Sequence, residues 1–230
     1  MSAEAILAID GPAGAGKSTV SKQVADELGL EMLDTGAMYR AVTLAVLQAH
    51  VPLDAPAACS EIASRVAIEL RDGTTWLDGI DVSVDIRTPE VTRAVSVVAA
   101  HAGVRSALVA HQRHWAATRA AGVVEGRDIG SVVFPESRCK IFLSASAAER
   151  ARRRQIDEAN AGRTVTIDEL VADIERRDQL DSNRAVSPLV QAEDAQAVDT
   201  TGRTIDAVVD EIVQRYRAAN PSGEAVDVSA

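Results

Sequence analysis

The sequence has few of the features that mark secreted, metal-binding or membrane proteins. It contains only two cysteines, Cys59 and Cys139, which lie far apart and form no CxxC spacing. A disulfide framework is therefore not expected. The N-terminal segment carries Glu4 and only a short apolar run, unlike a signal peptide, and no other stretch approaches the length of a membrane span. These absences predict a protein of the reducing cytoplasm.

The charge balance limits the partners of the chain. Its formal net charge is -10 at neutral pH. Because binding to nucleic acid or to an anionic membrane needs a basic face, neither partner is expected. A chain of 230 residues with 47% hydrophobic residues can bury a core as one domain, or as one domain with an insert. No heptad pattern is present, so we expect a monomer.

A phosphate-binding loop is the most informative motif. Residues 11–18 read Gly-Pro-Ala-Gly-Ala-Gly-Lys-Ser, which matches G-x-x-x-x-G-K-[ST] and lies between a strand-like run and a helical pattern. Backbone N–H groups of such a loop surround phosphate oxygens, and the N-terminus of the following helix favours negative charge. The residues expected to contact ATP are Gly11, Pro12, Ala13, Gly14, Ala15, Gly16, Lys17, Ser18 and Thr19.

Two side chains of this loop carry specific chemistry. We expect Lys17 to reach the β- and γ-phosphates of ATP, and the Ser18 hydroxyl to hold the Mg²⁺ that bridges them. Glu125 follows the apolar pair Val123-Val124. A carboxylate in that position resembles the Walker-B acid of P-loop proteins, within reach of the Mg²⁺ shell.

Strand-like and helical patterns alternate along the chain, which predicts an α/β fold with a parallel sheet and helices on both of its faces. The strands are expected at residues 6–10, 31–34, 122–125, 140–143 and 195–199. The core is expected to comprise residues 1–55 and 105–220, and residues 221–230 are expected to form a disordered tail.

Residues 56–104 carry a different pattern and are expected to form an insert. Short apolar pieces are separated by the pairs Asp72-Gly73 and Asp78-Gly79, which favour β-hairpins. We therefore predict a small antiparallel sheet. A helix should then begin with Thr88 as its N-cap and Pro89 in its first turn, and Gly103 should mark a break before the next helix.

Arginine is concentrated in one stretch of this acidic chain, at Arg150, Arg152, Arg153, Arg154, Arg163, Arg176, Arg177 and Arg184. Guanidinium groups bind phosphate in a planar, bidentate manner. Residues 146–149 and 166–169 both match capping boxes and predict the starts of two helices. Together they predict a helical lid, centred on about residues 152–168, that closes over ATP and excludes water.

The segment Glu125-Gly-Arg-Asp-Ile-Gly130 follows a strand at its carboxyl end, which is where ligands bind in open α/β sheets. Arg127 suits the phosphate of an acceptor molecule, and Asp128 suits an amino donor. These residues therefore predict a second binding site next to the phosphate-binding loop.

Four motifs, in this order, resemble those of the bacterial cytidylate kinase family. They are Asp10-Gly-Pro-Ala-Gly-Ala-Gly-Lys-Ser-Thr19, Leu33-Asp-Thr-Gly-Ala-Met-Tyr-Arg40, Gly126-Arg-Asp-Ile-Gly130 and Asp181-Ser-Asn-Arg-Ala-Val-Ser-Pro188. The resemblance covers nearly all of residues 5–218. It implies a P-loop kinase core, an NMP-binding insert with a small antiparallel sheet, and a helical lid. The implied reaction is phosphoryl transfer from Mg-ATP to CMP or dCMP, in pyrimidine nucleotide metabolism. One departure is Glu125, where the family commonly has aspartate.

Matching positions imply roles for individual residues. Those implied to bind CMP are Thr35, Tyr39, Arg40, Ser96, Arg105, Arg127, Asp128, Arg177, Asp181 and Arg184. Among them, Arg40 and Arg127 would hold the acceptor phosphate. Cytosine would be read by Ser96, Arg105 and Asp128, and the sugar would be held by Arg177, Asp181 and Arg184. From the arginine cluster and the loop together, the residues that we expect to neutralise charge during transfer are Lys17, Arg127, Arg153 and Arg154.

Two other functions remain open from the sequence. One is a kinase for a different acceptor, such as UMP or a small non-nucleotide acid. The other is a nucleotide-gated regulatory module of the GTPase type. That module would need an N-K-x-D guanine reader, which the sequence lacks.

Overall fold

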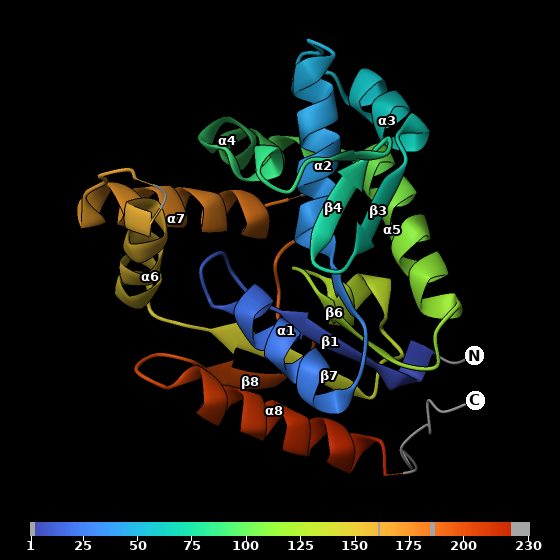
Figure 1. The fold of residues 1–230 in the computed structure, drawn as a ribbon, viewed down its shortest axis with the longest axis vertical. Coiled ribbons are helices and arrows are strands. Elements are labelled where there is room, and N and C mark those ends of the chain that lie inside the picture. Colours follow the sequence, from blue (N-terminus) through green and yellow to red (C-terminus); the bar gives the residue numbers. More distant parts are fainter. Residues whose placement is uncertain (1–2, 161, 185–186, 222–230) are drawn as a thin grey trace.

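A five-stranded parallel sheet forms the centre of the molecule in the computed structural model, which describes residues 3–160, 162–184 and 187–221 (Figure 1). The order of the strands in the sheet is β2-β6-β1-β7-β8. Their bounds are β1 Ile6–Asp10, β2 Met32–Asp34, β6 Gly122–Glu125, β7 Cys139–Ser144 and β8 Gln196–Asp199. The predicted parallel sheet is therefore confirmed. The expected tail lies almost wholly outside the described residues.

Side chains alternate between the two faces of the sheet and build two apolar cores. Leu7 and Ile9 of β1 pack against α1 (Lys17–Leu28) and α8 (Ile205–Ala219). Ile6 and Ala8 belong to the core on the opposite face, to which α2 (Thr35–Gln48) and α5 (Ala102–Ala117) contribute. Because β1 lies between β6 and β7 and is buried throughout, the loop that follows it begins at a rigid point.

The insert contains one helix before its sheet and one after it. Helix α3 (Pro56–Arg65) leads into a three-stranded antiparallel sheet. The strands are β3 Ile68–Arg71, β4 Thr74–Leu77 and β5 Ile80–Asp81. Both predicted Asp-Gly turns are present, with positive φ at Asp72, Gly73, Asp78 and Gly79.

Helix α4 (Pro89–Val98) closes the insert, and its start is as predicted. The Thr88 hydroxyl accepts from the Val91 N–H, and Pro89 occupies the first turn. The predicted break is displaced, because α5 begins at Ala102 and therefore contains Gly103. The turn between the helices lies at residues 99–101 instead.

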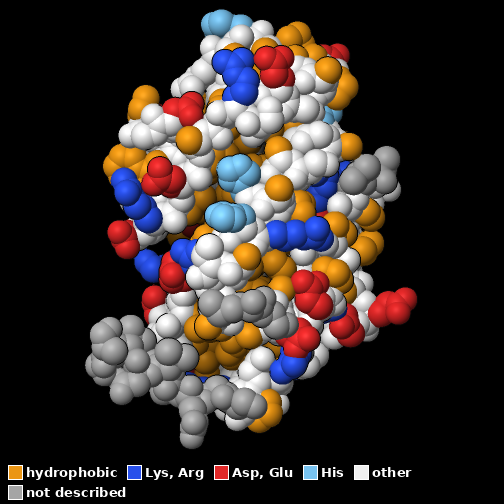
Figure 2. All heavy atoms as spheres, turned by 90° about the vertical axis from the view of Figure 1, so that its right-hand side faces the viewer, with side chains coloured by type: hydrophobic (Ala, Val, Ile, Leu, Met, Phe, Trp, Pro, Cys, Tyr) orange, Lys and Arg blue, Asp and Glu red, His pale blue; other side chains and the backbone are white. Residues whose placement is uncertain are grey.

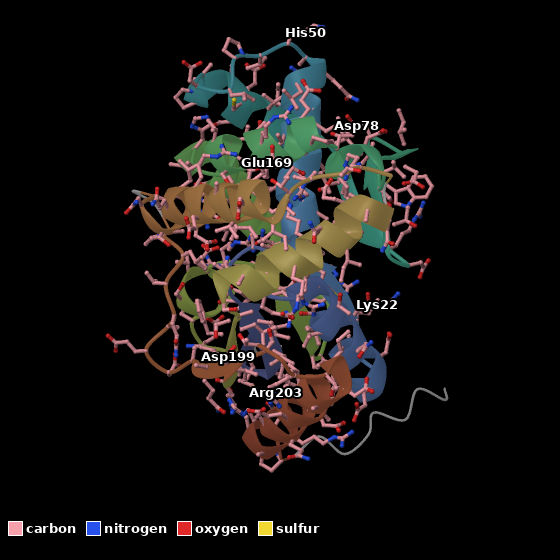
Figure 3. The ribbon with its side chains drawn as sticks, turned by 90° about the vertical axis from the view of Figure 1, so that its left-hand side faces the viewer. Lys22, His50, Asp78, Glu169, Asp199 and Arg203 are labelled. Atoms are coloured by element: carbon pink, nitrogen blue, oxygen red, sulfur yellow. The ribbon has the colours of Figure 1, made fainter. Side chains whose placement is uncertain are left out.

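Two further helices, α6 (Ala147–Asn160) and α7 (Ile167–Ser182), pack on each other through Ala151, Leu170 and Ile174. Figure 3 looks onto this pair, with α4 above it and with α1 and α8 below. The capping box at the start of α7 is complete, because Thr166 and Glu169 exchange both bonds.

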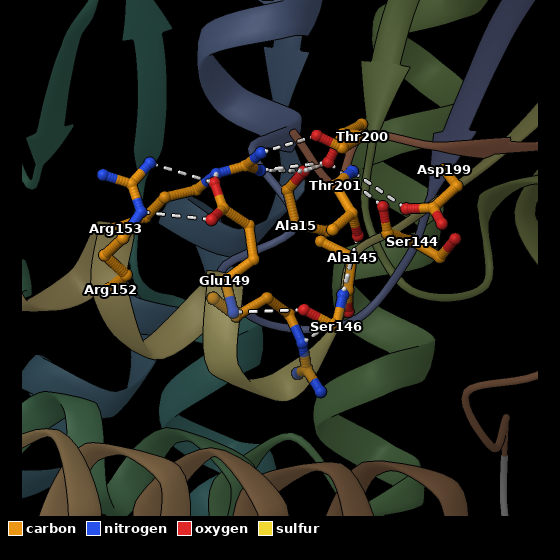
Figure 4. Close-up of polar contacts among 11 residues, drawn as sticks. Ala15, Ser144, Ala145, Ser146, Glu149, Arg152, Arg153, Asp199, Thr200 and Thr201 are labelled. Atoms are coloured by element: carbon orange, nitrogen blue, oxygen red, sulfur yellow. Dashed lines mark hydrogen bonds and ion pairs between the residues drawn. The ribbon is translucent and has the colours of Figure 1, made fainter. Parts of the chain in front are cut away.

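The predicted capping box at the start of α6 is only half formed (Figure 4). Ser146 Oγ accepts from the Glu149 N–H at 3.2 Å, as expected. The reciprocal bond is absent, because the Ser146 N–H donates to Thr201 Oγ1 at 3.1 Å. The Glu149 carboxylate instead binds Arg152 and Arg153. Competition from these two guanidinium groups explains why the second half of the prediction is wrong.

The first and last described elements lie together. Tyr216 Oη of α8 donates to the Ala5 carbonyl oxygen at 2.9 Å. In Figure 1 this region is on the side of the molecule opposite to α6 and α7.

Among the described residues, no single helix has the length and apolarity to cross a membrane. The pair α4 and α5 reaches that length only with a bend of 99° between its two helices. Figure 2 shows the face that includes α3 and α5, over which charged side chains of both signs are scattered around several histidines. Within the described ranges, no group of three or more His, Cys, Asp or Glu is placed to hold a metal ion.

Candidate active site

The phosphate-binding loop connects β1 to α1 at the centre of the sheet. Gly11 has a φ of 149°, and a Cβ built on it would overlap the Leu143 carbonyl oxygen of β7. Only glycine fits this close approach of two backbones. Gly16, with a φ of 89°, precedes the first residue of α1. The loop therefore runs directly into the N-terminus of α1, where the helix dipole favours a bound anion.

Lys17 is buried at the base of this loop. Its Nζ donates to the carbonyl oxygens of Gly11 and Pro12, both at 2.9 Å. Burial and the nearby guanidinium of Arg127 lower the pKa of Lys17 to about 7, although Glu125 acts in the opposite direction. A phosphate bound beside Nζ would raise the pKa of Lys17 again and keep the side chain protonated.

Glu125 ends β6 directly opposite Asp34 of β2 in the sheet register. Its Oε1 is buried and has no hydrogen-bond partner among the described residues. Burial, and then the charge of Asp34, raise the pKa of Glu125 to about 7, against the effects of Lys17 and the Ser18 hydroxyl. A buried carboxylate oxygen without a partner, beside a second carboxylate and a hydroxyl, is a donor set that fits Mg²⁺.

Asp10 plays a part that the sequence pattern did not indicate. Its two carboxylate oxygens accept from the N–H groups of Ile129 and Gly130, each at 2.8 Å. These N–H groups belong to a single π-helical turn, Ile129–Val133, that directly follows Arg127 and Asp128. Burial raises the pKa of Asp10 to about 6 despite these two bonds.

One cavity brings together all ten residues that were matched to CMP binding. We call it the central cavity, and it is lined by Thr35, Gly36, Tyr39, Arg40, Val95, Ser96, Ala99, Arg105, Gly126, Arg127, Asp128, Arg177, Asp181 and Arg184. These residues come from α2, α4, α5, the end of β6 and α7 or its C-terminal extension. Residues separated by most of the chain therefore meet at the carboxyl edge of the sheet, as expected for an α/β fold.

Asp181 on α7 connects three parts of the molecule. It accepts from Ser96 Oγ of α4 and from Arg127 Nε, each at 3.1 Å, and it pairs with Arg184. Burial acts to raise the pKa of Asp181, but Arg127 and Arg184 hold it below its usual value. The carboxylate therefore stays ionised and joins α7 to α4 and to the residues that follow β6.

Arg105 and Asp128 form a buried ion pair that also lines the central cavity. The Arg105 guanidinium also lies 5.5 Å from the centroid of the Tyr39 ring. Burial raises the pKa of Asp128, against the effect of Arg105. Because each charge compensates the other, the pair can present a carboxylate and a guanidinium to a ligand without a free buried charge.

Three arginines of the central cavity repel one another. Burial, followed by the charge of Arg87, lowers the pKa of Arg40 to about 10. Burial and the charges of Arg127 and Arg40 lower the pKa of Arg177 to about 9. A guanidinium keeps its proton at neutral pH. The lowered pKa values therefore indicate that positive charge accumulates unfavourably in this cavity. A bound phosphate dianion would remove that cost.

Arg40 is also fixed in orientation. It donates to the Ile86 carbonyl oxygen at 3.0 Å and to Thr92 Oγ1 at 2.9 Å, so the insert positions a side chain of the core. Thr35 Oγ1 donates to the Glu125 carbonyl oxygen at 2.7 Å. The Thr35 bond holds the start of α2 against the end of β6.

The arginines of α6 contact different parts of the molecule. Arg153 points to the phosphate-binding loop, where it donates to the Ala15 carbonyl oxygen at 3.4 Å and to Thr200 Oγ1 at 3.0 Å (Figure 4). Arg154 instead faces α4. Arg150 is buried, with bonds to Asp178 at 2.6 Å and to the Ala13 carbonyl oxygen at 3.1 Å. The structure therefore does not bring Arg153 and Arg154 to the same place.

The chain is similar to known proteins over most of its length. A family model described as cytidylate kinase matches residues 7–218. A cytidylate kinase from Desulforamulus reducens is 55% identical over 210 residues, which cover 90% of this chain and 94% of that protein. A bifunctional pantoate ligase/cytidylate kinase from Trichormus variabilis is 51% identical over 220 residues, and the match covers 92% of this chain but 41% of that longer protein.

The fold is also found among solved structures. An uncharacterised protein from Eubacterium ventriosum superposes with a TM-score of 0.53 at 13% identity, covering 93% of this chain and 98% of that one. At this level of identity the similarity concerns the fold alone.

Proposed function

This chain belongs to the cytidylate kinase family, and we propose that its central cavity and phosphate-binding loop together transfer a phosphoryl group from ATP to CMP or dCMP. The observation that carries this proposal is the meeting of ten residues of one ligand site beside Lys17, where burial and the mutual repulsion of Arg40, Arg127 and Arg177 lower the pKa of Arg40 and of Arg177. The products are CDP or dCDP and ADP.

Transfer proceeds by in-line attack of a CMP phosphate oxygen on the γ-phosphorus of ATP. The bond from that oxygen to phosphorus forms as the bond to the β-phosphate oxygen breaks. No general base is needed, because a phosphate monoester is largely ionised near pH 7. Arg40 and Arg127 hold the acceptor phosphate in line, and Lys17 exchanges its two loop carbonyl partners for the phosphates of ATP.

The buried pair of Arg105 and Asp128 reads the base, together with Ser96. Cytosine offers a 4-amino donor beside the N3 and O2 acceptors, which complement a carboxylate, a guanidinium and a hydroxyl. Uracil would turn its O4 acceptor towards Asp128. Since an unsatisfied buried polar group costs about 1–3 kcal/mol, CMP is preferred over UMP.

Mg²⁺ is the cofactor that the donor set fits. Ser18 would hold it together with the phosphates of ATP, and Glu125 and Asp34 would bind it directly or through its water ligands. When bound, it neutralises charge on the β- and γ-phosphates. The longer side chain of Glu125 keeps the charge of the aspartate that is common in the family.

Helices α6 and α7 act as the lid that excludes water from the reacting phosphates. Arg154 would contribute charge from the acceptor side. The contacts of Arg153 favour a different position for its charge, on the donor side of the site beside Ala15 and Thr200. In this proposal the kinase core comprises residues 1–55 and 105–220, the lid is centred on residues 152–168, and residues 56–104 form the NMP-binding insert.

We further propose that the enzyme acts as a cytoplasmic monomer in pyrimidine nucleotide metabolism, without nucleic-acid or membrane partners. The net charge of -10 supports the last part, because it disfavours contact with polyanions.

The decisive experiment is a panel of acceptors at fixed ATP and Mg²⁺. ADP release would be measured with CMP, dCMP, UMP and AMP, using the wild-type protein and the Lys17→Met variant as a control. Fast turnover confined to CMP and dCMP, and lost in the variant, is the expected result. Equal turnover with UMP would contradict the assignment of the base-reading residues. ADP release that does not depend on adding any acceptor would contradict the function itself.

A further inference from the structure

A second cavity lies between α4 and the two lid helices, and it shares only Ser96 and Arg177 with the residues assigned to CMP. We call it the outer arginine cleft, and its volume is about 210 Å³. Its lining comprises Arg87, Pro89, Thr92, Arg93, Ser96, Arg154, Glu158, Arg163, Val165, Leu170, Asp173, Arg176, Arg177 and Leu180. Arginines from the insert therefore face arginines from the lid across one space.

Positive charge exceeds negative charge in this cleft, which has six arginines against two carboxylates. Both carboxylates already have partners, because Glu158 pairs with Arg163 and Asp173 pairs with Arg176. Neither Arg87 nor Arg93 forms an ion pair with any described residue. A chain with a net charge of -10 thus carries a local surplus of guanidinium groups that have no counterion of their own.

The lining has a shape and chemistry that suit a small anion. Pro89, Val165 and Leu170 supply apolar surface on the same walls as the arginines. Guanidinium groups that approach from two sides can bind the oxygens of one tetrahedral phosphate. Arg87 and Arg93 are exposed, so the attraction that each exerts on a bound anion is modest and depends on salt.

The cleft meets the central cavity at two residues that line both spaces, Ser96 and Arg177. The Nε of Arg177 is buried and has no partner among the described residues. Arg87 is also the neighbouring charge that contributes most to the lowered pKa of Arg40. Arginine side chains therefore line both spaces, and Arg177 is common to the two.

We infer that the outer arginine cleft binds a second phosphate group, carried on the sugar of the acceptor nucleotide. This inference rests on the proposed function, in which Arg177 and Asp181 hold the sugar and Ser96 the base. A cleft that opens beside those residues would receive a 2′- or 3′-phosphate of cytidine 5′-monophosphate. The ligand class is thus a cytidine bisphosphate, which binds more tightly than CMP itself.

The test compares dissociation constants of four probes at low ionic strength by titration calorimetry. The probes are CMP, cytidine 3′,5′-bisphosphate, cytidine 2′,5′-bisphosphate and inorganic phosphate. In wild-type protein, at least one bisphosphate should bind about tenfold or more tightly than CMP, as expected for new charge-assisted hydrogen bonds. In the double variant Arg87→Gln/Arg93→Gln this advantage should largely disappear, while CMP affinity changes by less than about twofold.

The matched control is Arg65→Gln/Arg71→Gln, which removes two exposed arginines from the same insert at places outside the cleft. It should keep the full bisphosphate advantage. Equal binding of CMP and both bisphosphates to the wild-type protein would overturn the inference, as would an advantage that survives loss of Arg87 and Arg93. So would binding of inorganic phosphate to the cleft without any gain for a bisphosphate.

Failure of the inference can be told from failure of the proposed function. If CMP binds and is phosphorylated but the bisphosphates gain nothing, only the inference is wrong. If CMP neither binds nor accepts phosphate, the assignment of the central cavity is wrong as well.

Discussion

The Asp10 carboxylate at the end of β1 accepts a 2.8 Å hydrogen bond from the N–H of Gly130, which lies 120 residues further along the chain. The other carboxylate oxygen accepts from Ile129. Since Arg127 and Asp128 directly precede this turn, the carboxylate that precedes the phosphate-binding loop also fixes two residues of the central cavity. A single side chain thereby connects the loop to the cavity.

Replacing Asp10 by asparagine should weaken CMP binding. The amide has one oxygen, so one of the two N–H groups loses its acceptor and faces an NH₂ group instead. Because a buried unsatisfied donor costs about 1–3 kcal/mol, the turn should shift to find another acceptor and move Arg127 and Asp128 out of position, and we expect the KM for CMP to rise by roughly tenfold. Steady-state kinetics would measure it, with thermal melting to verify the fold. An unchanged KM for CMP in a folded Asp10→Asn variant would contradict this role.

The pH profile should also depend on Asp10. Its pKa is raised to about 6, so protonation below that pH removes one acceptor oxygen. The CMP phosphate gains a proton in the same range, near pH 6. We therefore expect kcat/KM for CMP to fall on the acid side with a slope steeper than one proton in the wild type, and with a one-proton slope in Asp10→Asn. Identical slopes would exclude Asp10 from the acid limb.

Binding of ATP should be accompanied by proton uptake at alkaline pH. The pKa of Lys17 is lowered to about 7, so much of this side chain is neutral above that pH. Phosphate contacts would raise its pKa again, so up to one proton is taken up and ATP affinity falls as pH rises. Calorimetry at about pH 8.5 in two buffers of different ionisation enthalpy measures this uptake.

The Lys17→Met variant provides the control for that measurement. It should show no proton uptake and should lose at least about a hundredfold in kcat, the loss expected for removal of one preorganised charge. If the variant still takes up a proton on binding ATP, the titrating group is not Lys17.

Asp128→Asn should reduce the preference for CMP over UMP. The amide can donate to uracil O4 as well as accept from cytosine, so the ratio of kcat/KM values for CMP and UMP should fall by about tenfold. The KM for ATP should not change, because Asp128 lies in the central cavity and not in the loop. The variant Asp54→Asn removes an exposed carboxylate and serves as a control. A ratio that stays at the wild-type value would separate Asp128 from base recognition.

Two ion pairs of the lid should differ in their effect on stability. Arg150 is buried and pairs with Asp178, so Arg150→Met leaves a partly buried carboxylate and the Ala13 carbonyl oxygen without their partner. We expect a loss of about 3 kcal/mol in the free energy of unfolding. Arg176 pairs with Asp173 on the surface, and Arg176→Met should change it by less than about 1 kcal/mol. Denaturant titration would compare them, and equal losses would contradict the structural role of Arg150.

Local patterns were sufficient to predict most elements, whereas most residues of the central cavity were predicted only through the resemblance to a known family. The loop at residues 11–18, the Asp-Gly turns and the caps at Thr88 and Thr166 each depend on a few neighbouring residues, and the structure agrees with them. Helix α3 was not predicted, because Pro56–Arg65 has only two buried residues and hence a weak periodic signal.

Contacts between distant segments could not be predicted in this way. The bond between Arg153 and Thr200 requires knowledge that β8 lies beside β7, and the same adjacency brings Thr201 to Ser146 and disrupts the expected capping box. The carboxylate of Asp10 had no partner within its own segment. Its role as a hydrogen-bond acceptor depends on the fold, which places β1 beside the turn at Ile129–Val133.

The bond between Tyr216 and Ala5 has a consequence for how such an enzyme can be combined with others. It brings the first and last described elements together on the side of the molecule opposite to α6 and α7 (Figure 1). A second catalytic unit joined near either point would leave α6 and α7 unobstructed. The same proximity should allow circular permutation, with the old ends linked by a short flexible segment and new ends opened in the Asp72-Gly73 turn.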